Sequence, residues 1–226
     1  MAPANVKKIV CVDCPLQAND NGISRFMSDR RNQVDGLYSK LSGKGYLLVP
    51  LFNPHLEELQ SAIADSSVAF LTASGHGTDD GKSFVREWND DLLVSGGLYD
   101  RMSFNDKVVH LFACATAENL GPDMVGPDLH DGTGVRAFIG YNAAFNFALN
   151  YHQDQVAAQM IVDCDSAIDL ALADGKTPDQ AVASAAAAFD ALINEWQFDQ
   201  SRKALVDLVR RDREALCLLP GLYKPS

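Results

Sequence analysis

The sequence predicts an α/β protein in which a mostly parallel sheet of about six strands lies between two layers of helices, a three-layer sandwich. Runs of strand length, rich in branched and aromatic residues, alternate with segments of helical periodicity. The third to fifth runs are apolar almost throughout, which is typical of parallel strands covered on both faces. With 226 residues, 47% of them hydrophobic, the chain is expected to form one domain over residues 1–226.

Six runs are expected to form the strands of this sheet. They cover residues 6–13, 46–52, 68–73, 107–113, 134–141 and 216–219. Pro50 has no backbone N–H to donate to a neighbouring strand, so the second run is expected to lie at an edge of the sheet or to end early. His110 lies in the middle of the fourth run and is expected to be a buried histidine that contacts the core or a helix.

Helical patterns separate and follow these runs. The expected helices cover residues 34–41, 56–63, most of the chain from 156 onward, and 202–214. The sequence TPDQ at 177–180 predicts a helix start, in which Thr177 is the N-cap and Gln180 completes a capping box. Residues 75–106 are rich in glycine and aspartate without a clean period, and we expect a long loop that is functional or mobile.

Composition excludes several classes of function. The net charge of -11 argues against binding of nucleic acid, which requires a basic surface. No apolar run approaches the ~20 residues that span a bilayer, and the N-terminus has no signal-peptide pattern. Five widely spread cysteines are an odd number, so reduced thiols in the cytoplasm are expected. The phosphate-binding loop, the dinucleotide fingerprint and the Gly-x-Ser-x-Gly elbow are all missing.

Two reactive side chains follow consecutive apolar runs of the expected sheet. His76, flanked by two glycines, comes just after the third run, and Cys114 comes directly after the fourth. Ligands collect at the carboxyl ends of parallel strands, so these side chains are expected to be neighbours. A thiol and an imidazole suit nucleophilic catalysis, because histidine exchanges protons near neutral pH. The backbone amides of Gly77 and Cys114 are candidates for an oxyanion hole.

The ordered motifs resemble the caspase-like fold of the clan CD cysteine peptidases, nearest to the bacterial CHAT-domain and gingipain-like proteases. The resemblance covers most of the chain. Its motifs are SGHG at 74–77, ACAT at 113–116, VRAFIGY at 135–141, ADGKT at 173–177 and LCLLPG at 216–221.

The resemblance implies a cysteine endopeptidase that acts on protein or peptide substrates. Cys114 would attack the peptide carbonyl and form an acyl-thioenzyme, and His76 would protonate the leaving amine. No metal or organic cofactor is implied. The segment before the cysteine departs from caspases and metacaspases, which carry a polar residue two positions earlier to read the substrate side chain. Here that residue is Phe112.

Two other residues are candidates for the substrate pocket. In the resembled fold the end of the first strand lines that pocket, and Asp13 stands there. If Asp13 points inward, it would favour a basic substrate side chain. Asn142, just after the fifth run, is the second candidate.

Other interpretations of the sequence stay open. The same fold can lose activity and act as a regulatory or protein-binding module with a regulatory protein partner. A receiver-like or small-molecule-binding α/β domain would need an acidic cluster at the strand ends, where Asp13 stands alone. A redox function for Cys11 and Cys14 is disfavoured, because the pair begins inside a strand and side-chain alternation turns the two thiols to opposite faces.

Overall fold

The computed structural model describes residues 6–15, 22–87, 91–126, 133–145 and 154–221. Its centre is a six-stranded sheet with the strand order β2-β1-β3-β7-β8-β9. The strands are β1 (Lys8–Asp13), β2 (Leu47–Phe52), β3 (Val68–Ser74), β7 (Val108–Phe112), β8 (Ala137–Tyr141) and β9 (Leu216–Pro220). The first five are parallel, and β9 runs antiparallel to β8. The predicted fold class is confirmed.

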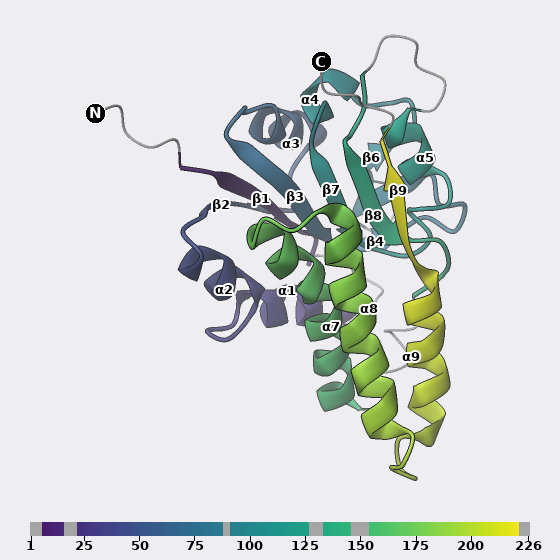
Figure 1. Cartoon of the computed structure of the whole chain (residues 1–226). Helices are drawn as coiled ribbons and strands as arrows, with labels where there is room; N and C mark the ends of the chain where they lie inside the picture. Colours follow the sequence, from purple (N-terminus) through teal and green to yellow (C-terminus); the bar gives the residue numbers. More distant parts are fainter. Residues whose placement is uncertain (1–5, 16–21, 88–90, 127–132, 146–153, 222–226) are drawn as a thin grey trace.

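Helices cover one face of this sheet (Figure 1). They are α1 (Ile23–Asn32), α2 (Leu37–Gly43), α7 (Gln155–Ala173), α8 (Pro178–Trp196) and α9 (Lys203–Ala215). The expected start of α8 is confirmed, because Thr177 caps the helix and forms the capping box with Gln180. β2 is an edge strand, as Pro50 predicted.

In the described part of the chain, the opposite face is covered by three short helices and a second sheet. These are α3 (Leu56–Ile63), α4 (Arg101–Phe104), α5 (Leu120–Val125), and the antiparallel strands β4 (His76–Gly77), β5 (Ser83–Glu87) and β6 (Asp91–Ser95). Residues 75–106 are therefore not one long loop, which corrects the prediction. Each strand here has five residues or fewer, and the pairing of β5 with β6 is irregular, so the sequence carries no clean period.

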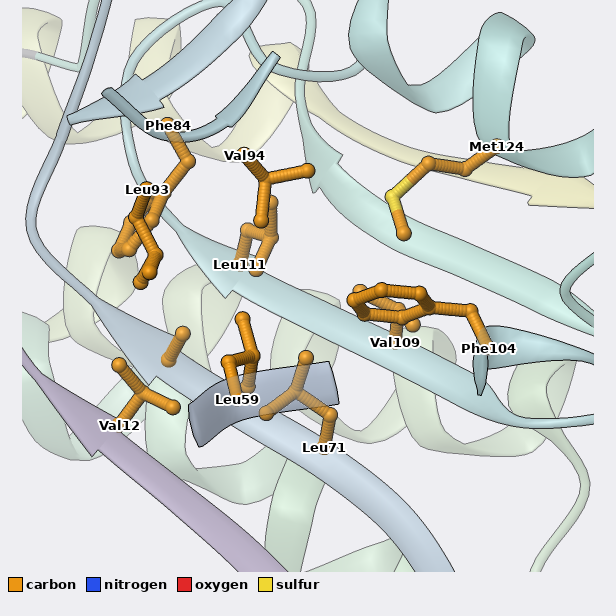
Figure 2. Close-up of a pocket in the computed structure, with 11 residues that line it drawn as sticks. Val12, Leu59, Leu71, Phe84, Leu93, Val94, Phe104, Val109, Leu111 and Met124 are labelled. Atoms are coloured by element: carbon orange, nitrogen blue, oxygen red, sulfur yellow. The ribbon is translucent and has the colours of Figure 1, made fainter. Parts of the chain in front are cut away.

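The space between the large sheet and this second layer is a hydrophobic core. Figure 2 shows apolar side chains from β1, β3 and β7 meeting Phe84, Leu93, Val94, Phe104 and Met124 around a small gap. The gap measures about 10 Å³, and no polar side chain is among the described residues that line it. The residues that line this gap stabilise the fold by apolar packing, and none of them has a titratable side chain.

A chain of buried polar groups crosses the helix-covered face of the sheet. The ring nitrogens of His110 lie 2.9 Å from a carboxylate oxygen of Asp169 and 3.3 Å from one of Asp165. Tyr141 donates its hydroxyl hydrogen to Asp165, and Thr72 donates to Asp169. The expectation that His110 is buried and contacts a helix is confirmed, since both aspartates belong to α7.

Candidate functional site

β3 and β7 pair in parallel, so the segments that follow them start at the same edge of the sheet. Ser74 is paired with Phe112, and His76 and Cys114 each lie two residues further along. The N–H of Gly75 donates to the carbonyl oxygen of Phe112, at 3.3 Å, which extends the strand pairing beyond the last paired residues. The structure thus brings the two reactive segments together.

His76 and Cys114 line one pocket of about 40 Å³. Both residues are half-buried. The pocket is lined, in the described part of the chain, by Ile23, Met27, Gly75, His76, Phe112, Ala113, Cys114 and Phe145. Apart from the imidazole and the thiol, these residues contribute only apolar side chains or backbone.

Glycines allow the histidine segment to contact the cysteine segment through the backbone. A Cβ atom added to Gly77 would lie 1.9 Å from the carbonyl oxygen of Cys114, and one added to Gly81 would lie 2.5 Å from that of Ala115. No side chain fits at such distances, so glycine is required at both positions. The approach holds the backbones of the two segments in contact.

The residue after the candidate nucleophile has an unusual backbone conformation. Ala115 has a φ angle of +54°, in the left-handed region that alanine rarely adopts. Its N–H donates to the carbonyl oxygen of Ala143, at 2.9 Å. Strained backbone of this kind is common at functional sites, where surrounding contacts hold it in place.

The sulfur of Cys114 accepts a hydrogen bond from the backbone N–H of Phe145, with 3.3 Å between nitrogen and sulfur. Burial raises the pKa of the Cys114 thiol, the Phe145 N–H opposes that increase, and the negative charges of Asp212 and Asp79 add to it. The resting side chain is therefore a thiol. It becomes an efficient nucleophile only when a neighbouring base removes its proton.

Asp13 does not line this pocket. Its side chain is 1% exposed, and its carboxylate accepts hydrogen bonds from Ser74, at 2.6 Å, and from Tyr38, at 2.7 Å. The Nε atom of Arg31 lies 3.4 Å from the same carboxylate and balances its charge. The expectation that Asp13 points into a substrate pocket and selects a basic side chain is not supported, because the carboxylate of Asp13 is already paired with buried Arg31.

Asn142 also lies elsewhere. It is exposed and lines a separate open hollow of about 410 Å³ with residues that include Arg211 and Glu214 of α9. Its N–H donates to the carbonyl oxygen of Ala215, at 2.9 Å. The backbone amides of Gly77 and Cys114 lie in segments that contact each other, and their role as an oxyanion hole stays a prediction.

Several residues near the thiol were not predicted from the sequence. Ile23 and Met27 belong to α1, a helix that the sequence did not predict. Its buried side also carries Ser28, Arg30 and Arg31, so the sequence shows no apolar helical period there. The charged run at 210–214 is typical of a solvated helix face, but this interpretation is wrong for Asp212, which is fully buried and whose negative charge raises the pKa of the Cys114 thiol. A signal for Asp212 was present in the sequence. It follows buried Leu205 and Val209 at helical spacing, which places it on the inner side of α9.

The other cysteines offer no second site. Cys11 packs in the core cluster with α2 and α7, whereas Cys14 packs in the cluster on the opposite face, as strand alternation predicted. All five cysteines are free thiols. Within the described ranges, no group of three or more histidine, cysteine or acidic residues is placed to hold a metal ion.

The fold and the site define a mixed α/β protein with a half-buried thiol and an imidazole on one pocket. A scan of protein-family models found none that matches this chain, and a search of curated proteins found no match either. None of the helices in the described part of the chain has the length and apolar character that a bilayer crossing requires.

Proposed function

We propose that this protein is a cysteine endopeptidase of the caspase-like type, in which Cys114 and His76 form the catalytic pair. The observation that carries the proposal is that these two residues, remote in sequence, line the same pocket where β3 and β7 end. The six-stranded sheet and the sequence motifs agree with a resemblance to CHAT-domain and gingipain-like proteases. The free thiols fit a reducing compartment, and we propose the cytoplasm.

In the proposed reaction, His76 takes the proton from the sulfur of Cys114, and the sulfur attacks the carbonyl carbon of a peptide bond. The backbone amides of Gly77 and Cys114 stabilise the negative oxygen that forms. The carbon–nitrogen bond then breaks, and His76 returns the proton to the leaving amine. Water, with His76 as the base, hydrolyses the acyl-thioenzyme and regenerates the thiol. A peptide and water are the only reactants required.

A second function is a caspase-like module that has no activity and binds a regulatory protein partner. One observation favours it. Burial and the charges of Asp212 and Asp79 raise the pKa of the Cys114 thiol, which lowers the thiolate population at neutral pH. A thiol left in this state without a functioning base would be a core side chain and not a nucleophile.

Alkylation of the full-length protein by iodoacetamide, mapped by mass spectrometry, separates these functions. The catalytic pair predicts that Cys114 reacts at least about tenfold faster at pH 7 than half-buried Cys217, and that His76→Ala removes the difference. His55→Ala is the matched control, because His55 is exposed on the surface. Peptide-library cleavage that disappears in Cys114→Ala would complete the case. Equal alkylation in wild type and His76→Ala, without cleavage, would instead identify the module.

A further inference from the structure

We infer that the His76–Cys114 pocket accepts an apolar side chain of modest size next to the bond that is cut. This inference rests on the proposed peptidase function and names its substrate class. It replaces the preference for a basic side chain that Asp13 suggested from the sequence.

The walls of the pocket are apolar. Ile23 and Met27, one turn apart on α1, are 6% and 5% exposed, and Phe112 and Phe145 are 1% and 9% exposed. The two phenylalanine rings meet edge to face, with 4.9 Å between their centroids. An ammonium or carboxylate group that entered would lose its hydration without finding a partner among the described side chains, apart from His76.

The nearby carboxylates are unsuited to bind a basic substrate. Asp13 is buried and paired with Arg31. Asp212 and Asp79 are close enough to influence the thiol, but neither lines the pocket. Asp212 is fully buried on α9, and Asp79 is exposed in the turn after β4. If their charge dominated, a basic side chain would be preferred, which is the competing prediction.

The volume sets the size of the side chain. The pocket of about 40 Å³ could hold about three water molecules. This is close to the three or four side-chain heavy atoms of valine or leucine. An aromatic ring exceeds this space. Met27 forms part of the wall, so shortening this side chain enlarges the pocket without adding a polar group.

Covalent probes test this inference on the full-length protein without a known substrate. The probes are tripeptide chloromethyl ketones that differ only in the residue attached to the ketone, which is alanine, leucine, phenylalanine, arginine or aspartate. The sulfur of Cys114 bonds to the methylene carbon, the carbon–chlorine bond breaks, chloride leaves with the bonding electrons, and His76 takes the thiol proton. Mass spectrometry gives the rate constant of Cys114 alkylation by each probe.

The alanine and leucine probes are expected to react at least about tenfold faster than the arginine and aspartate probes. Met27→Ala should raise the rate of the phenylalanine probe about tenfold relative to the alanine probe. Met102→Ala is the matched control, because Met102 is 62% exposed and should leave the order unchanged. Should Met27→Ala fail to fold, the order of rates in the wild-type protein decides alone.

Failure of the inference and failure of the proposed function look different. Faster reaction of the arginine or aspartate probe, or equal rates for all five, would overturn the inference while the His76 dependence of iodoacetamide labelling still supports the catalytic pair. Labelling of Cys114 that does not depend on His76 would overturn both.

Discussion

Gly77→Ala tests the contact on which the site geometry depends. The added Cβ would lie 1.9 Å from the carbonyl oxygen of Cys114 and 3.1 Å from the side chain of Thr116. Real Cβ atoms stay beyond 3.0 Å of such neighbours, so the two backbone segments must separate by about 1 Å. A displacement of this size between reacting groups should lower the rate of Cys114 alkylation about 100-fold. The overpacking should lower the unfolding free energy by about 1–3 kcal/mol.

Gly43→Ala is the matched control for this substitution. Gly43 ends α2, has no atom within 4 Å of an added Cβ, and does not have a positive φ angle. Alanine there should leave Cys114 alkylation unchanged and stabilise the protein by about 0.5–1 kcal/mol. Urea unfolding and the iodoacetamide rate of Cys114 measure the two effects. If Gly77→Ala reacts and unfolds like the wild type, the close approach of the two segments is wrong.

Three other predictions concern buried charges. Burial alone would lower the pKa of His110, but Asp169 and Asp165 outweigh it and raise the pKa to about 10. The stabilisation is complete below the unfolded value of 6.5 and is lost as the pH rises toward 10, so the unfolding free energy should fall by about 1.4 kcal/mol per pH unit between pH 7 and 8.5. Urea titrations should show this slope in wild type and not in His110→Gln. Asp212→Asn should lower the pKa of the Cys114 thiol, because its charge raises that pKa, and the pH profile of alkylation should move to lower pH; an unchanged or rising midpoint would contradict the assignment. Arg31→Met should cost about 3–5 kcal/mol of unfolding free energy, measured by urea unfolding, since it leaves the buried carboxylate of Asp13 without its arginine partner, and a loss below about 1 kcal/mol would contradict this ion pair.

The sheet was predictable because local patterns dictate it. Branched and aromatic runs marked all six strands, Pro50 identified an edge, and the capping residues Thr177 and Gln180 fixed the start of α8. These signals act within a few residues of the chain. They do not depend on which segments meet in the folded protein.

What the sequence did not reveal depends on distant partners. The helix α1 buries Arg30 and Arg31, whose charges are balanced by Asp163 and Asp13, so its inner side shows no apolar period. The same pairing removes Asp13 from the candidate pocket. The order of the strands predicted that His76 and Cys114 lie at one edge of the sheet. The apolar walls around them come from segments whose proximity only the folded structure shows.

The two carboxylates that hold His110 have a consequence for how the molecule is assembled. Asp165 and Asp169 are one turn apart on α7 and contact opposite nitrogens of a single ring. Rotating α7 by one residue, about 100°, would move the carboxylates of Asp165 and Asp169 away from the imidazole and leave them buried without this partner. Apolar packing alone would tolerate several alignments of α7 against the sheet, whereas the contacts of both aspartates with His110 favour a single alignment.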